Sequence, residues 1–167
     1  MNDKTDIFLS VVQANKGIIY KVVNSYCKSI EDREDLVQEI IIQLWKSFDK
    51  YNKEVKYSTW MYQIALNVAI SFYRKENTRK QIASPLTESI IEFTDDGYDD
   101  KETNLGILQR MILQLADLDK ALILLYLEEK SHKEIAQIMG ISESNVATKI
   151  GRIKKILKEK MENFKSQ

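Results

Sequence analysis

The chain is poor in the residues that interrupt helices or build disulfides. Its 167 residues include five glycines, one proline and one cysteine. So few glycines and prolines favour long helices over a sheet of many short strands. The single cysteine, Cys27, excludes an intrachain disulfide and a thiolate metal cluster.

The sequence also lacks a long apolar run. The longest extends from Ala121 to Leu127, far short of the roughly 20 residues that span a membrane. The start, Met1 to Asp6, is polar and acidic and has no signal-peptide run behind it. We therefore expect a reduced, soluble, cytoplasmic protein with no membrane insertion. The sequence contains no P-loop, no nucleophile constellation and no metal-ligand cluster, so we expect no cofactor and no enzymatic activity.

The whole chain carries no net charge, although each of its parts does. The 25 basic and 25 acidic residues cancel. Residues 1–80 and 104–167 each carry a net charge of +3, whereas residues 81–103 carry −6. Two basic ends suggest contact with a polyanion at two places, while the neutral whole argues against strong non-specific DNA binding by the free chain.

This charge pattern coincides with a boundary in the hydrophobic pattern. Ser84-Pro85 ends any preceding helix, and Thr94 to Asp100 is polar and turn-rich. We expect an all-α protein with two small helical domains, residues 1–82 and 104–167, joined by an acidic flexible linker at residues 83–103.

In the first domain, apolar periodicity predicts helices near residues 5–28, 31–48 and 58–78. Ser58 or Thr59 is the expected cap of the third helix. The predicted inward stripe of the second helix is Leu36, Val37, Ile40, Ile41, Leu44, Trp45 and Phe48, and that of the third is Trp60, Ile64, Val68 and Phe72.

In the second domain, the pattern predicts four helices. The segment from Ala121 to Leu127 is apolar nearly all round, so its helix should be buried on most sides. Ser131 and Glu134 form a capping box at the start of the third helix. Gly140 then supplies a left-handed turn, and Ser142 caps the last helix. This register is typical of a helix-turn-helix.

The last helix should be the recognition helix. Its predicted buried side is Val146, Ile150, Ile153 and Leu157. On and beside the opposite face lie hydrogen-bonding and basic side chains suited to base edges and phosphates: Ser144, Asn145, Thr148, Lys149, Arg152 and Lys155. The alternative is a helical hairpin with an ordinary solvated face. It is disfavoured because the capping box, the turn glycine and the buried stripe occur together in the helix-turn-helix register.

Three motifs in chain order resemble RNA polymerase sigma factors of the sigma-70 family. Asp35-Leu36-Val37-Gln38-Glu39 with Leu44-Trp45 resembles the polymerase-clamp helix of region 2. Tyr57 to Asn67 resembles the promoter-opening segment that follows it, and Leu115 to Leu157 resembles region 4. The absence of a middle domain resembles the extracytoplasmic-function group.

The resemblance implies partners and roles. Asp35, Gln38 and Glu39 would bind core RNA polymerase, whereas periodicity alone favours a solvated helix face. Asn67 would contact a flipped base of the −10 element, the alternative being a core or capping amide. Further −10 contacts to promoter DNA would come from Tyr73, Arg74, Arg79 and Lys80, and the recognition helix would read the −35 element. An anti-sigma factor is the expected regulator, and the acidic linker would follow the RNA path of the polymerase unless it is a plain spacer.

Some residues depart from the family pattern, including Ala116 and Ala147, where proline and a basic residue are common. His132 replaces a frequent aromatic residue, and we interpret it as a surface residue. We interpret Cys27 and Trp60 as core residues. Two other classes remain open: a free-standing helix-turn-helix regulator, which would bind duplex DNA tightly alone, and a helical adaptor, which would bind only protein.

Overall fold

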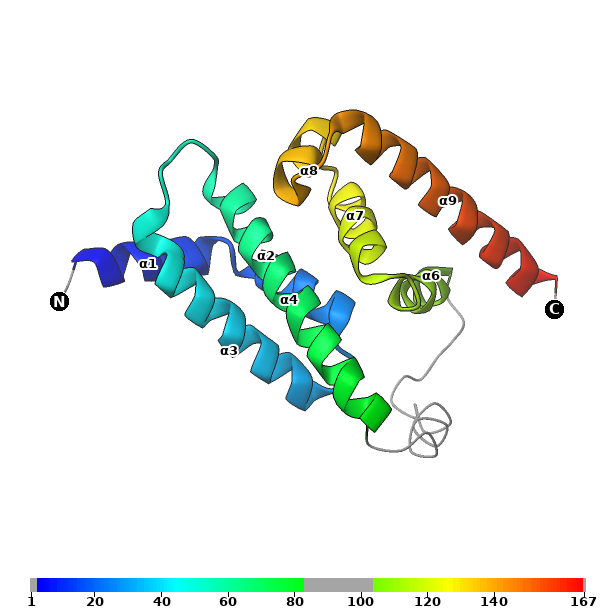
Figure 1. Cartoon of the computed structure of the whole chain (residues 1–167), viewed down its shortest axis with the longest axis horizontal. Coiled ribbons are helices and arrows are strands. Elements are labelled where there is room, and N and C mark those ends of the chain that lie inside the picture. The colour runs from blue at the N-terminus through cyan, green and yellow to red at the C-terminus, as the bar shows by residue number, and fades with distance from the viewer. Residues whose placement is uncertain (1–2, 83–103, 167) are drawn as a thin grey trace.

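The computed structural model describes residues 3–82 and 104–166, except for the side chains of residues 76–82 and 105. These residues form eight α-helices and one 3₁₀ turn, with no strand among them. The all-α expectation is confirmed. The predicted acidic linker, residues 83–103, lies outside the described part of the chain (Figure 1).

The first unit contains α1 (Asp3–Ala14), α2 (Lys16–Tyr26), α3 (Ile30–Ser47), η1 (Phe48–Lys50) and α4 (Tyr57–Ile82). The prediction of one helix over residues 5–28 is wrong, because the chain breaks at Asn15. There φ is −121° and ψ is 18°, and the side-chain amide donates to the Val11 carbonyl at 2.9 Å. An asparagine side chain can hydrogen-bond to a nearby backbone carbonyl in this way, which competes with helix continuation.

α3 is held at its start by Ser29, whose hydroxyl accepts from the Asp32 amide at 3.1 Å. Leu36, Ile40 and Leu44 are fully buried against the rest of the unit. Trp45, placed in the same stripe by the sequence, is instead 38% exposed. Its ring lies at the edge of the core, with its centroid 5.0 Å from that of Phe8 in α1.

α4 is the central helix of the first unit. It begins at Tyr57, one residue ahead of the predicted cap at Ser58. The expected stripe is only partly right: Trp60 is buried as predicted, but Ile64, Val68 and Phe72 are half-buried. The most deeply buried residues of α4 lie on a different face, formed by Met61, Tyr62, Ala65, Leu66 and Ala69.

The second unit contains α6 (Asn104–Leu113), α7 (Asp117–Leu127), α8 (His132–Met139) and α9 (Glu143–Lys165). These are the four helices that the sequence predicts. His132 is exposed, as expected, and Cys27 of the first unit is buried, as expected. α6, α7 and α8 all pack against α9.

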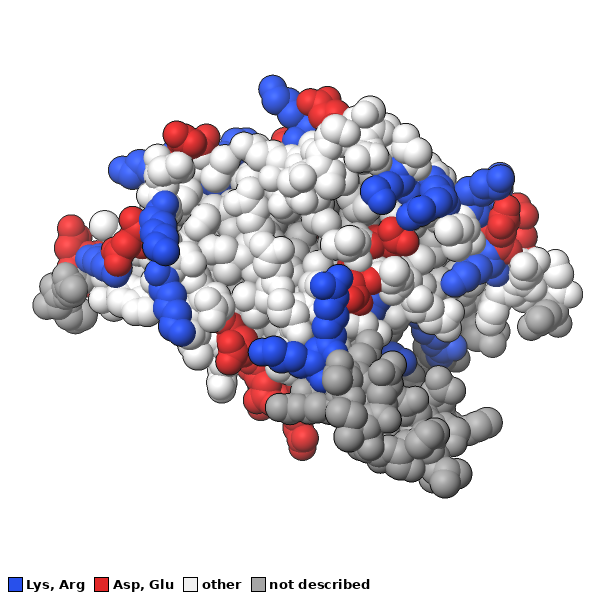
Figure 2. Space-filling view, in the orientation of Figure 1, with Lys and Arg blue, Asp and Glu red and all other residues white. Residues whose placement is uncertain are grey.

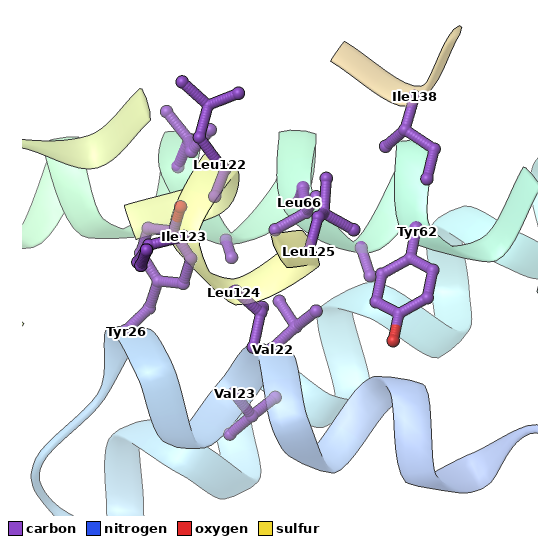
Figure 3. Packing of buried hydrophobic residues seen from close by; sticks show 14 of the residues in the cluster. Val22, Val23, Tyr26, Tyr62, Leu66, Leu122, Ile123, Leu124, Leu125 and Ile138 are labelled. Carbon is purple, nitrogen blue, oxygen red and sulfur yellow. The ribbon is translucent and has the colours of Figure 1, made fainter. Parts of the chain in front are cut away.

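The two units pack against each other through α6, α7 and α8. α2 contacts α6 and α7, and α4 contacts α7 and α8. Figure 3 shows Leu122, Ile123, Leu124 and Leu125 of α7 in one cluster with side chains of α2 and α4, including Val22 and Leu66. The burial on most sides predicted for this helix is therefore confirmed from Ala121 to Leu125, where both units supply the cover, whereas Leu127 is 49% exposed.

Candidate nucleic-acid interface

The turn between α8 and α9 is built by three local devices. The Ser131 hydroxyl accepts from the Glu134 amide at 3.1 Å, and the Ser142 hydroxyl accepts from the Asn145 amide at 3.2 Å. Between them Gly140 adopts φ +69°, and its amide and that of Ile141 both donate to the Ala136 carbonyl. The helix-turn-helix geometry expected from the sequence is present.

The outward face of α9 carries the predicted DNA contacts. Its inward face buries Val146, Ile150, Ile153 and Leu157. On the other side Ser144, Asn145, Thr148, Arg152 and Lys155 are exposed, and Lys149 is half-buried. All six predicted −35 residues therefore lie clear of the core, where a groove of DNA could reach them.

Two side chains of α7 hold basic residues of α9. Asp119 Oδ1 accepts from Arg152 Nη2 at 3.3 Å, and the Tyr126 ring lies 4.3 Å from Lys154 Nζ. The Arg152 side chain remains 57% exposed, so a base or phosphate can still reach its guanidinium. Asp119 and Tyr126 were not predicted, because a contact between residues so far apart in the sequence leaves no local pattern.

Charge is unevenly distributed over the described surface. α9 contains seven basic and three acidic residues. Figure 2 shows blue side chains gathered over the part of the molecule that α9 occupies, while the middle of the same face is uncharged. This gives α9 the positive field that attracts a polyanion.

A second candidate interface is a groove between α3 and α4. It encloses about 580 Å³ and is open to solvent. The half-buried Ile64, Val68 and Phe72 form its apolar part. Polar groups surround them: Glu39, Gln43, Ser47, Asn67, Ser71 and Lys75. A groove of this composition fits a flat, partly polar group such as a nucleobase.

Asn67 lies in this groove and is exposed. A buried amide needs hydrogen-bond partners within the protein, and an exposed one does not. The alternative of a core amide is therefore wrong for Asn67. Three neighbours in the groove, Gln43, Ser71 and Lys75, were not predicted as site residues, because their pairing depends on how α3 meets α4.

The predicted −10 residues do not form one site. Asn67 faces the groove, whereas Tyr73 and Arg74 contact the second unit. The Tyr73 ring lies 4.2 Å from Lys120 Nζ, and Arg74 Nε donates to Asp117 Oδ2 at 3.1 Å. Arg79 and Lys80 lie in the last turns of α4, and their side chains are outside the described residues.

The predicted polymerase-binding residues Asp35, Gln38 and Glu39 are all exposed on α3. The exposed surface continues along the helix to Ile42, 45% exposed, and Trp45. Charged and amide groups thus adjoin two large apolar side chains, a mixture typical of a protein-binding surface. Glu39 also lines the groove that contains Asn67, so the two candidate surfaces adjoin.

Within residues 3–82 and 104–166, no group of three histidine, cysteine, aspartate or glutamate residues could hold a metal ion. None of the helices in these ranges combines the length and hydropathy that crossing a bilayer requires.

Comparison with known families gives two matches in chain order. Residues 11–79 match the family model described as Sigma-70 region 2, and residues 105–157 match that described as Sigma-70, region 4. The first match covers α2, α3 and most of α4, and the second covers the helix-turn-helix.

Comparison with individual proteins extends the likeness over nearly the whole chain. The chain is 28% identical to the ECF RNA polymerase sigma factor SigW of Bacillus subtilis, over 95% of this chain and 91% of that protein. It is 28% identical to the ECF sigma factor SigM of the same organism, over 89% and 91%.

Two solved structures share the fold. CnrH, solved in complex with the cytosolic domain of CnrY, gives a TM-score of 0.67 at 16% identity and covers 95% of this chain and 90% of its own. The sigma factor RpoE of Bartonella quintana, solved with the anti-sigma factor NepR, gives 0.62 at 17% identity, with 97% and 98% covered.

Proposed function

The chain belongs to the extracytoplasmic-function group of the sigma-70 family, and on that premise we propose a role for each of its interfaces. It is a sigma factor: it binds core RNA polymerase and directs promoter-specific initiation of transcription. The observation that carries this function is the ordered pair of region 2 and region 4 matches, each on its own helical unit. Polymerase performs the phosphoryl transfer, so the sigma factor needs no catalytic residue of its own.

In our proposal the unit at residues 104–167 reads the −35 element. The N-terminal turns of α9 enter the major groove, where Ser144, Asn145 and Thr148 meet base edges. Lys149, Arg152 and Lys155 bind phosphates or guanine edges farther along the helix.

The unit at residues 1–82 holds the opened −10 strand. A base that leaves the stack enters the groove between α3 and α4, where the Asn67 amide offers a donor and an acceptor to its edge. Ile64, Val68 and Phe72 cover the flat faces of the base, and Lys75 neutralises an adjacent phosphate. Tyr73, Arg74, Arg79 and Lys80 bind the backbone on either side.

Asp35, Gln38 and Glu39 bind core polymerase, and Ile42 and Trp45 extend that contact. Exposed apolar residues beside polar ones favour a partner that covers them. The two structural neighbours, solved with the cytosolic domain of CnrY and with the anti-sigma factor NepR, support control by an anti-sigma factor in this chain as well. We place the protein in the cytoplasm, at the nucleoid when active.

Run-off transcription with core polymerase and a library of genomic promoters tests the function. We expect transcripts from a small set of templates that share two elements, and none without the chain. If the chain yields no transcript on any template but binds duplex DNA tightly by itself, the alternative of a free-standing regulator is correct.

A further inference from the structure

Lys120 is the one charged side chain that the fold buries within the described residues, with 1% of its surface exposed. It belongs to α7 of the second unit, but its ammonium points at aromatic rings of the first. Nζ lies 4.2 Å from the ring centroid of Tyr73 and 5.3 Å from that of Tyr26. These two rings also contact each other edge-on, with their centroids 6.3 Å apart.

Asp117, one helical turn before Lys120, is bound to the same two parts of the first unit. Its backbone carbonyl accepts from the Tyr26 hydroxyl at 2.7 Å, and its carboxylate accepts from Arg74 at 3.1 Å. The start of α7 is thus fixed to the end of α2 and to the middle of α4 by a cation, an ion pair and a hydrogen bond.

The buried ammonium makes the contact between the two units easier to break. Burial lowers the pKa of Lys120, and nearby Lys28 lowers it further, while Tyr73 and Asp117 act in the opposite direction. A buried charge is costly unless its partners compensate, and an apolar residue in its place often gives a firmer interface. Lys120 regains full hydration as soon as the two units separate, so it weakens a contact that the apolar side of α7 would otherwise hold closed.

We propose that the cluster of Lys120, Asp117, Tyr26, Tyr73 and Arg74 is a reversible latch that closes the free chain, in which Tyr73 is half-buried and Asp117 neutralises the exposed Arg74, so that both residues bind nucleic acid less well. The proposal rests on the −10 role proposed above for these two residues. Asn67 and its groove lie on another face of α4 and stay open in the closed form. The latch thus leaves the base-reading group accessible while it weakens two of the backbone contacts, by partial burial of Tyr73 and by pairing of Arg74.

Distance measurement on the free chain tests the closure without reference to DNA. Spin labels on Asn24→Cys in α2 and Glu129→Cys just after α7 report on the contact between the two units, because the neighbouring Lys21 and Glu128 form an ion pair across it; both positions are exposed, and Cys27 is buried. We expect one narrow short-distance population in the parent chain. Lys120→Glu, which buries a carboxylate beside Asp117, should raise the long-distance fraction by roughly tenfold or more.

Lys133→Glu is the matched control, because it makes the same charge change at an exposed position of the second unit. It should leave the distances unchanged. Asp117→Lys, which repels Arg74, should open the chain in the same way. It serves as the second test if Lys120→Glu does not fold. A parent-like distribution in a folded Lys120→Glu or Asp117→Lys chain would overturn the latch.

Binding of a fluorescein-labelled single-stranded DNA of mixed sequence tests the proposed effect of the latch on Tyr73 and Arg74. Lys133→Glu should weaken it, because the chain becomes more acidic. Lys120→Glu makes the same charge change and should nevertheless bind several-fold tighter, because Tyr73 and Arg74 are released. If the Lys120→Glu chain opens but does not bind the DNA more tightly, the proposed effect of the latch on Tyr73 and Arg74 is wrong. If no variant binds this DNA even with core polymerase, the proposed −10 role fails, while the distance result still decides the latch.

Discussion

At the scale of single residues, Asn67 and Tyr73 differ in environment although one helix carries both. They are six residues apart, so about 100° of rotation per residue places them on different faces of α4. Asn67 faces the open groove toward α3, and Tyr73 faces α7. A resemblance assigns both to one promoter element, but helical geometry assigns them to different surroundings in the free chain.

Replacing Asn67 with alanine should separate base recognition from folding. Because the side chain is exposed, Asn67→Ala should change the free energy of unfolding by less than about 0.5 kcal/mol. It should retain polymerase binding and lose most open-complex formation, measured by permanganate footprinting, and a pre-melted template should restore part of it. Asn163→Ala, an equally exposed change on α9, is the control. Normal opening by Asn67→Ala would remove Asn67 from the −10 site.

The α3 surface can be tested in the same manner. A double change, Gln38→Ala with Glu39→Ala, should weaken binding of core polymerase at least about tenfold, because hydrogen-bonding groups at an interface centre are costly to remove. Helicity and melting temperature should stay nearly the same, since both side chains are exposed. The pair Gln13→Ala with Glu54→Ala makes the same changes at other exposed positions and should bind normally. Equal affinity for both pairs would exclude this face as the clamp contact.

At the scale of elements, local signals predicted well and long-range packing did not. The caps at Ser131 and Ser142 and the left-handed Gly140 depend on residues within one turn, so the sequence contains them in full. Trp45 was misplaced because α1 covers only part of it. The buried face of α4 was misjudged because the helix packs on α2, α3 and the second unit, and a single stripe cannot describe several contacts.

The same distinction holds for the candidate site. The exposed face of α9 follows from helical period and was predicted with all its residues. The groove between α3 and α4, and the anchoring of Arg152 by Asp119, require knowledge of which helices meet, and neither was predicted. All five −10 residues were predicted on the resemblance, and the position of Asn67 in an open groove came from the structure.

Gly140 offers a test of the helix-turn-helix as an element. A Cβ added there meets nothing within 4 Å, so Gly140→Ala should destabilise the fold through its φ of +69° alone, by about 1–2 kcal/mol. Gly17→Ala, also free of contacts but inside α2, should stabilise by up to about 1 kcal/mol. Urea denaturation followed by circular dichroism measures both. A stabilising Gly140→Ala would mean that the turn adopts another conformation in solution.

At the scale of the whole molecule, two DNA-binding surfaces on separate units imply weak binding by the free chain. One recognition helix neutralises only a few phosphates, and small modules bury little surface alone. We expect weak, salt-sensitive binding of duplex promoter DNA by the purified chain, and tight selective binding with core polymerase present, in an anisotropy titration. Nanomolar selective binding by the chain alone at physiological salt would favour a conventional repressor or activator.

The contact between the units should also respond to alkaline pH. Burial, assisted by Glu128, raises the pKa of Tyr62 from its usual 10.0 to about 12, and burial raises that of Tyr26 as well. Between pH 10 and about 12 the unfolded chain releases protons that the folded chain retains, so stability falls across this window and is unaffected by these groups below it. Tyr62→Phe should reduce this loss in urea melts recorded at several pH values, and Tyr20→Phe, at an exposed position, should not. If the free energy of unfolding falls equally steeply with pH in the two variants, Tyr62 is not the cause of the loss.

The sharing of α7 between two cores has a consequence for biosynthesis. The apolar sides of α2 and α4 are complete once α4 has left the ribosome, but the helix that covers them belongs to the second unit. At roughly 5–20 residues per second, synthesis of residues 83–127, which end with α7, leaves those surfaces uncovered for about 2–9 s. During that interval the nascent chain exposes an apolar patch to which chaperones and neighbouring nascent chains can bind. Substitutions that enlarge the patch should therefore lower the yield of folded protein in the cell before they alter transcription.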